Sequence, residues 1–114
     1  MPYEKKALKI FQQPLDTMFT TAIHTIQYMG GKVIKQDQVK GILIAQMDKK
    51  LFGDYLGDRS QLEITFTESD DQGTQIELFA FPLNAIGQKL MFGARDGVVE
   101  TIIRTFFIEL EKRL

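Results

Sequence analysis

Residues 95–114, RDGVVETIIRTFFIELEKRL, decide the fold that this sequence favours. The large apolar residues of this stretch recur at spacings of three and four, which is the period of an α-helix. They are Val99, Ile103, Phe106, Leu110 and Leu114, and Val98, Ile102 and Phe107 widen the same stripe. Asp96 is suited to cap the start of such a helix. The stretch therefore predicts a long closing helix whose broad apolar face must pack on the rest of the chain.

The preceding residues predict a sheet and one further helix. Leu15 to Met29 carries a helical apolar stripe, between Pro14 and Gly30, which favour helix starts and ends. The stretches that favour strands are Ala7 to Gln12, Lys32 to Asp37, Val39 to Asp48, Gln61 to Thr67 and Thr74 to Phe81. The order strand, helix, four strands, helix predicts a single α+β domain over residues 1–114. We expect an antiparallel sheet, mainly a meander, with both helices packed on one face.

Two segments depart from these helix and strand patterns and lead to further predictions. Gly41 lies inside a predicted strand, which indicates a bulge or the close approach of another group. Lys49 to Ser60 fits no single hydrophobic period and is predicted to be a loop. It carries Leu51, Phe52 and Tyr55, which are large apolar residues for a loop in so small a domain. We expect these three either to pack back on the core or to contact a ligand or partner.

The composition narrows the classes of partner. The chain has 14 Lys and Arg against 15 Asp and Glu. Since phosphate contacts dominate nucleic-acid affinity, this balance predicts no nucleic-acid binding. There is no cysteine, which excludes disulfides and thiolate metal sites. No stretch has the apolar length of a signal peptide or a transmembrane segment, so we expect a cytoplasmic protein.

Three segments resemble known domains. Phe92-Gly93-Ala94-Arg95-Asp96-Gly97-Val98-Val99 is similar to a segment of uncharacterised bacterial helix-grip domains, in which an aromatic-glycine pair precedes the closing helix. Gly41 to Ala45 and Ser60 to Phe66 resemble two of their strands. The TATA-box-binding-protein-like fold has the same general shape. The resemblance implies a curved antiparallel sheet wrapped around the closing helix, and it implies no catalytic residues. Those domains tend to carry tryptophan before the glycine, where this chain has Phe92.

The polar candidates favour ordinary structural roles. His24 is the single histidine and lies opposite the apolar stripe of its helix, so we expect it to face solvent rather than act as a base or metal ligand. Glu68, Asp70 and Asp71 lack the spacing of a calcium loop and predict a hairpin turn. Arg95 precedes a helix N-terminus that could hold an anion, but the surrounding spacing matches no phosphate-binding motif. The sequence therefore predicts no catalytic residue, no cofactor and no metal.

The apolar candidates leave two alternatives open. Phe79 and Phe81 fall on the outward face of their predicted strand, and Met91 and Phe92 follow. They either form a patch through which two copies associate, or are covered by the loop from Leu83 to Phe92. Between the sheet and the closing helix there is either a filled core or a ligand cavity, lined by Met18, Phe19, Met47, Phe52 and Phe106. Phe107 and Ile108 extend the stripe of the closing helix and mark its flank as the place for a cavity or a partner.

These observations predict a small non-catalytic binding or interaction module that self-associates as a homodimer. One alternative is a carrier or sensor of a small apolar ligand held between the sheet and the C-terminal helix. An enzyme is a further alternative, and the sequence offers no polar constellation for it. The residues expected to contact a partner or ligand are Leu51, Phe52, Tyr55, Phe79, Phe81, Met91, Phe92 and Arg95.

Overall fold

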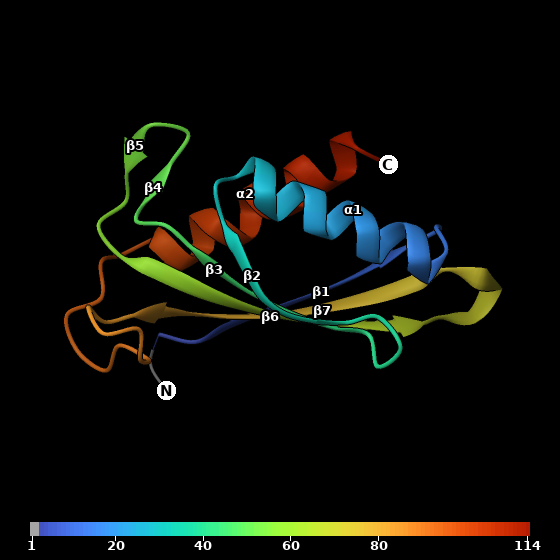
Figure 1. The fold of residues 1–114 in the computed structure, drawn as a ribbon, viewed down its shortest axis with the longest axis horizontal. Helices are drawn as coiled ribbons and strands as arrows, with labels where there is room; N and C mark the ends of the chain where they lie inside the picture. The colour runs from blue at the N-terminus through green and yellow to red at the C-terminus, as the bar shows by residue number, and fades with distance from the viewer. Residues whose placement is uncertain (1–2) are drawn as a thin grey trace.

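Five strands form one antiparallel sheet, and two helices lie on one of its faces (Figure 1). The structure is a computed structural model and describes residues 3–114. The strands of this sheet are β1 (Lys5–Phe11), β2 (Lys32–Asp37), β3 (Ile42–Met47), β6 (Arg59–Glu68) and β7 (Thr74–Leu83). The helices are α1 (Leu15–Tyr28) and α2 (Val98–Lys112). The predicted α+β fold with both helices on one face is confirmed.

The strand order β1-β7-β6-β3-β2 makes most of the sheet a meander, as predicted. Strands β2, β3, β6 and β7 follow one another in sequence and in space, and a 3-10 turn, Asp70–Gln72, links the last two. Strand β1 pairs with the outer side of β7, from Lys5 opposite Ala80 to Phe11 opposite Thr74. Strands β1 and β2 are therefore the two edges of the sheet.

The core lies between the sheet and the two helices, and side chains fill it. Along β6, Leu62, Ile64 and Phe66 are buried, while the residues between them face the other side of the sheet. Met18 of α1 and Phe106 of α2 have no accessible surface, so no space that admits a water molecule borders them. The filled core is thus the correct alternative under the closing helix. Phe52, which was predicted to line a cavity there, is exposed and lies outside this core.

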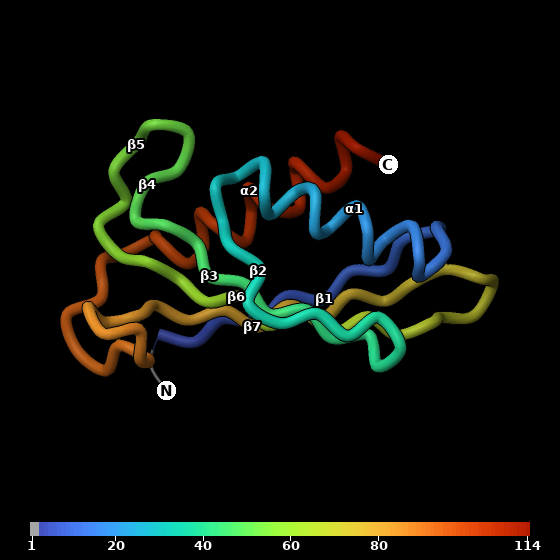
Figure 2. Tube along the Cα trace, viewed as in Figure 1, coloured from blue at the N-terminus to red at the C-terminus, as the bar shows by residue number. Residues whose placement is uncertain are grey.

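The predicted loop from Lys49 to Ser60 contains a small hairpin that no local sequence pattern predicted. Strands β4 (Lys50–Leu51) and β5 (Asp54–Tyr55) pair antiparallel, and Phe52 and Gly53 form the turn, both with positive φ. The hairpin stands on the helix side of the sheet at one end of the molecule (Figure 2). Its Leu51 side chain is buried in the core, so of the two alternatives for Leu51 the structure shows packing on the core.

The N-cap of helix α2 lies one residue later than predicted. It is Gly97, with φ +79°, and no side chain caps the helix. Asp96 therefore does not cap the helix. The left-handed conformation at Gly97 suits a residue without a Cβ atom and lets the chain turn sharply into the helix.

The backbone of another strand closely approaches Gly41, as the position of this glycine in the sequence indicated. Its φ is +69°, and a Cβ atom on it would collide with the Phe66 carbonyl oxygen. The Phe66 N–H donates a hydrogen bond of 2.7 Å to the Gly41 carbonyl. Glycine at this position therefore lets β6 approach the start of β3.

Candidate functional site

The residues that the sequence singled out for binding do not form one site. Leu51 and Phe81 are each only 6% exposed and are unavailable for contact. The Phe52 ring lies against Tyr28 of α1, with ring centroids 5.4 Å apart. Tyr55 and Arg95 lie at the end of the molecule where the hairpin and the loop of residues 84–97 line one cavity, and Met91 and Phe92 are exposed residues of this loop.

Phe79 and Phe81 lie together on the sheet face that carries no helix. Their ring centroids are 5.8 Å apart, and the Lys89 ammonium lies 4.7 Å from the centre of the Phe81 ring. The Leu90 N–H donates to the Pro82 carbonyl, and Lys89 pairs with Glu4, so the loop is fastened over the strand. For Phe81 the loop covers the ring within the monomer. Phe79 is half-buried, with Lys6 and Lys89 both 5.7 Å from its ring.

The Glu4–Lys89 contact joins the N-terminal segment to this loop. The hydrogen bond from Lys89 lowers the pKa of the Glu4 carboxyl, because it stabilises the ionised form. The Lys89 ammonium therefore interacts with the Glu4 carboxylate and with the rings of Phe79 and Phe81. This cluster explains why the outward aromatic pair, which looked like an open patch in the sequence, is largely closed.

A cavity of about 550 Å³ opens at the hairpin end of the molecule, and we call it the end pocket. Its lining comes from the hairpin, the start of β6, the end of β7 and the loop that follows. The lining residues are Lys49, Tyr55, Gly57, Asp58, Arg59, Leu83, Asn84, Ala85, Leu90 and Gly93. Arg95 lies beside it, with its N–H bonded to an Asp58 carboxylate oxygen at 2.8 Å and its side chain passing over Gly57.

A second cavity, of about 400 Å³, runs along the flank of the molecule between edge strand β1 and helix α2, and we call it the flank groove. Its apolar side chains are those of Ala7, Ile103, Phe107 and Ile108, whereas the Leu8 side chain alternates onto the helix-free face. Ile108 is about half exposed, at 47%. Phe107 is buried against Phe11, with ring centroids 6.4 Å apart. The groove therefore has a buried aromatic ring at its base and an accessible aliphatic side chain on its α2 wall.

Charged side chains form the rim of the flank groove. Three cations, Lys5, Lys9 and Arg104, lie around it with two carboxylates, Glu100 and Glu111, while the Lys6 ammonium lies near Phe79 on the helix-free face. Lys5 pairs with Glu100 at 3.8 Å and Lys9 with Glu111 at 3.4 Å, and all four side chains are substantially exposed. The Lys9 ammonium also lies 4.9 Å from the centre of the Phe107 ring. Positive charge thus exceeds negative charge around an apolar floor.

The sequence held one signal for this groove. The α2 residues that line it, at positions 100, 103, 104, 107, 108 and 111, follow the three-and-four spacing of one helix face. Phe107 and Ile108 were expected to mark the flank of the helix, and the groove lies there. The contribution of β1 was missed, because nothing local in the sequence places Lys5 to Lys9 beside the last helix.

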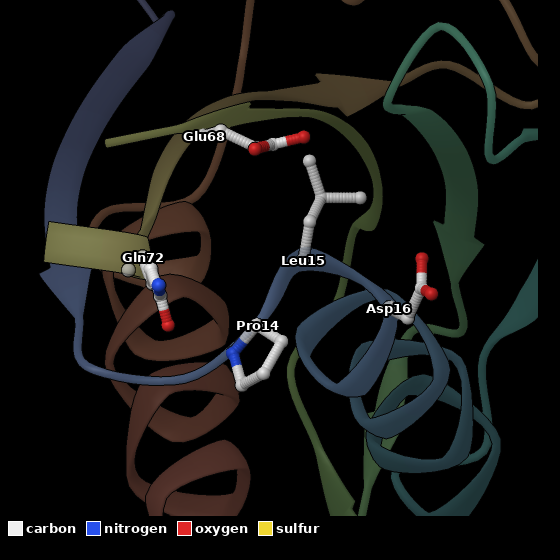
Figure 3. A pocket seen from close by; sticks show the side chains of 6 residues that line it. Pro14, Leu15, Asp16, Glu68 and Gln72 are labelled. Carbon is white, nitrogen blue, oxygen red and sulfur yellow. The ribbon is translucent and has the colours of Figure 1, made fainter. Parts of the chain in front are cut away.

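The acidic residues at the opposite end of the sheet do not converge. Asp16 and Glu68 both line a cavity of about 260 Å³ beside the start of α1. In the view of Figure 3 the Leu15 side chain stands between the two carboxyl groups. Asp16 accepts a hydrogen bond of 2.8 Å from the Gln38 amide. This arrangement is that of a helix start packed on a turn rather than of an acid–base pair.

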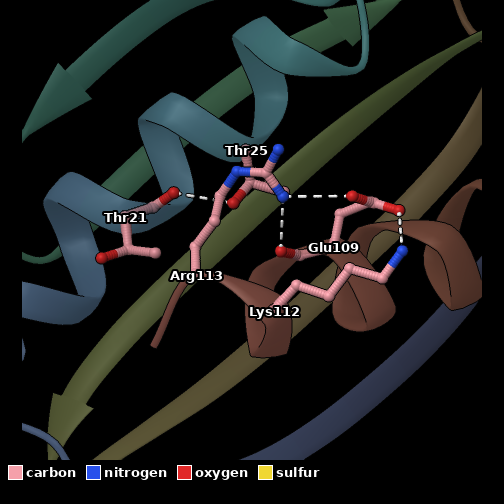
Figure 4. Close-up of polar contacts among 5 residues, drawn as sticks. All are labelled: Thr21, Thr25, Glu109, Lys112 and Arg113. Carbon is pink, nitrogen blue, oxygen red and sulfur yellow. Dashed lines mark hydrogen bonds and ion pairs between the residues drawn. The ribbon is translucent and has the colours of Figure 1, made fainter.

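Glu109 is the charged residue that the structure buries most, in a cluster near the C-terminus (Figure 4). Lys112 donates to one carboxylate oxygen and Arg113 to the other, each at 3.1 Å. These hydrogen bonds, the one from Lys112 first, lower the pKa of the Glu109 carboxyl. The Arg113 guanidinium also lies 4.1 Å from the centre of the Tyr28 ring, so the cluster links α2 to α1.

The potential metal ligands of the chain lie apart from one another. Within residues 3–114, no three His, Cys, Asp or Glu side chains come together as metal ligands. His24 is exposed on α1, as predicted. Neither helix of the described chain combines the length and the apolar character that crossing a bilayer requires.

Comparison with known proteins identifies the fold. No family model matches the chain, and no curated protein matches its sequence. The crystal structure of Ara h 8.0201 superposes with a TM-score of 0.67 at 8% identity, over 97% of each chain. A protein from Nitrosospira multiformis superposes with a TM-score of 0.57 at 10% identity, over 94% of this chain and 92% of the other. These likenesses support a helix-grip-like fold, and at such identities they carry the fold alone.

Proposed function

We propose that the protein is a small non-catalytic binding module whose flank groove takes an amphiphile, a molecule with an apolar body and a negatively charged group. The observation that carries the proposal is an open apolar groove with a rim of excess positive charge. The helix-grip-like fold is compatible with a ligand-binding role. In this proposal the ligand lies at the flank of the closing helix, outside the filled core.

The shape of the flank groove suits an apolar body. Its volume of about 400 Å³ falls within the usual size of small-molecule sites. Covering Ile108 removes apolar surface from water, and full burial of such a side chain contributes about 1.5–3 kcal/mol. The Phe107 ring beside it is already held by Phe11, so little order is lost on binding.

The charges of the rim suit a negative group at one end of that body. Arg104 forms no ion pair with a described residue and is exposed. Lys5 and Lys9 are held in exposed ion pairs, and such pairs contribute only about 0–1 kcal/mol, so a ligand can exchange for them. A carboxylate or phosphate on the ligand would gain charge-assisted hydrogen bonds from these donors.

The groove offers no catalytic arrangement. Its lining contains no histidine, serine, threonine or tyrosine, and its two carboxylates are in ion pairs. Acid–base catalysis needs groups with separated pKa values within reach of a substrate. A binding role is therefore the simpler use of these residues. The cytoplasmic location and the lack of nucleic-acid binding stay predictions from the sequence.

Titration calorimetry with dodecanoate below its micelle concentration tests this function. We expect saturable binding that Ile108→Asp weakens about tenfold or more, because it places a charge on the apolar wall. Arg104→Gln should weaken it about threefold to tenfold, while an uncharged dodecyl ligand should bind less tightly than dodecanoate. Ile86→Asp is the matched control, since Ile86 is exposed in the loop at the hairpin end. Equal binding by wild type and Ile108→Asp would exclude the groove.

Self-association through the same flank is a second candidate, favoured by the open edge of β1. One side of β1 pairs with no described strand, and Leu8 and Ile10 beside it are 53% and 56% exposed. Lysines on an edge strand usually oppose pairing. In an antiparallel pairing of two β1 strands centred on Leu8, however, Lys6 faces Ile10 and Lys5 faces Phe11, so no lysine faces a lysine.

Light scattering at several protein concentrations tests this second candidate. A homodimer that Leu8→Lys converts to a monomer is the expected result, with Phe79→Lys as the control on β7, the strand next to the edge. A strict monomer at high concentration would exclude the dimer. Loss of the dimer in Phe79→Lys alone would instead place the interface on the aromatic pair that the sequence first suggested.

A further inference from the structure

We propose that the end pocket is a second binding site, for a small organic anion that carries a carboxylate or a phosphate. The pocket lies at the hairpin end of the molecule, and none of its lining residues is shared with the flank groove. The proposal is therefore independent of the function of the groove. It rests on a positioned guanidinium, a neighbouring free ammonium and a loop whose hydrogen bonds hold both the guanidinium and the pocket wall.

Arg59 is the residue that gives the end pocket its chemistry. Its Nη2 donates to the backbone carbonyls of Asn84 and Ala85, at 3.0 and 3.3 Å. The other three N–H donors of this guanidinium have no acceptor among residues 3–114. The side chain is half-buried and lines the cavity. A guanidinium stays charged at all ordinary pH values, so these donors are available to an oxyanion.

The carbonyls that hold Arg59 are themselves held by a closed turn. The Asn84 side-chain oxygen accepts hydrogen bonds from the N–H groups of Ile86 and Gln88, at 3.1 and 2.9 Å. The Asn84 N–H donates to the Gln88 carbonyl at 2.7 Å. This turn fixes the two acceptors of Arg59 before any ligand arrives. Fixing a binding group in advance lowers the entropy cost of binding.

The remaining charges of the pocket also favour an anion. Lys49 lines the cavity, is exposed and forms no ion pair with a described residue. Asp58 is the one carboxylate in the lining, and one of its oxygens accepts the Arg95 N–H. The lining of the end pocket thus contains two cations, Arg59 and Lys49, and one carboxylate, Asp58, which is already hydrogen-bonded. The exposed Tyr55 ring on the wall offers a face for the organic part of the ligand.

The test is a titration of the nitrogen-15-labelled protein with benzoate and, separately, with inorganic phosphate, against a sodium chloride control. We expect saturable shifts of the amide signals of Lys49, Tyr55, Asp58, Arg59 and Gly93 with at least one of the two probes. Saturation with benzoate alone would assign an aromatic carboxylate, and saturation with phosphate would assign a phosphate group. Shifts that grow linearly, or that sodium chloride reproduces, would overturn the proposal.

Substitutions separate the pocket from general surface charge. Arg59→Gln should abolish saturation, and Lys49→Gln should weaken binding about threefold to tenfold with an unchanged melting temperature. Lys35→Gln is the matched control, because Lys35 is an exposed lysine on the distant edge strand β2. If Arg59→Gln fails to fold, Lys49→Gln decides alone, and wild-type affinity in that variant would overturn the proposal. Ile108→Asp should leave these shifts unchanged.

Discussion

Gly41 is a residue whose identity the backbone dictates. Its positive φ would cost a non-glycine residue about 1–2 kcal/mol by itself. The Phe66 carbonyl oxygen also occupies the place where a Cβ atom would lie. Backbone atoms cannot move aside as a flexible side chain can, so the two costs add. Glycine at position 41 therefore allows the start of β3 to lie against the central strand β6.

Gly41→Ala should accordingly destabilise the protein by more than positive φ alone explains. We expect a loss of about 2–4 kcal/mol in the free energy of unfolding, measured by urea denaturation. Gly30→Ala is the matched control, since Gly30 has a φ of +82° and no atom lies within 4 Å of its Cβ position. Its loss should be about 1 kcal/mol. Equal losses in the two variants would show that the contact with Phe66 contributes nothing.

The burial of Leu51 and Phe81 could not be predicted from the local sequence pattern. Both were candidates for contact with a partner, with packing inside the monomer as the alternative, because the local pattern gave them no inward face. Leu51 is buried because a two-residue turn folds its strand back onto the core. Phe81 is buried because Lys89, eight positions later, brings the loop over it. In each case the burial depends on a segment whose placement no local period reports.

Helix α2 was the most predictable element, and its ends and its charged flank were the least predictable parts of it. The apolar stripe located the helix because apolar residues that recur with a 3.6-residue period over several turns are typical of an amphipathic helix. Its N-cap is Gly97 because the backbone turns sharply there, and the presence of Asp96 does not predict this turn. Its C-terminal end is tied to α1 by Glu109, Arg113 and Tyr28.

The Glu109 cluster predicts how stability depends on pH. The pKa of Glu109 is lowered from an ordinary value of 4.5 in the folded protein, so its ionised form stabilises the fold. This contribution is complete above the ordinary pKa and is lost as the pH falls through the lower pKa of the folded state. Glu109→Gln should therefore lower stability at neutral pH and flatten the acid limb of the stability curve.

Urea midpoints measured from neutral pH down to about pH 3 check this prediction. Asp70→Asn is the control, because Asp70 is exposed in the turn between β6 and β7 and forms no ion pair with a described residue. An acid limb equally steep in wild type and Glu109→Gln would mean that the cluster does not contribute to stability at low pH.

At the scale of the whole molecule, the fold followed from periodicity and the binding surfaces did not. Strand and helix periods predicted the sheet, its mainly meander order and the placement of both helices. The flank groove forms because β1 lies at the sheet edge beside α2, so that Lys9 meets Glu111 although 102 positions separate them. The end pocket likewise needs the hairpin and the loop of residues 84–97 to meet. Such contacts between residues distant in the sequence depend on the packing of the whole molecule rather than on any one stretch of sequence.

The most direct measurement of the central claim is the position of bound dodecanoate by isotope-filtered nuclear Overhauser spectroscopy. We predict contacts between the methylene protons of the ligand and the side chains of Ala7, Ile103, Phe107 and Ile108. Contacts with buried core residues such as Met18 and Phe106, or with Phe79 on the opposite face, would contradict a site in the flank groove.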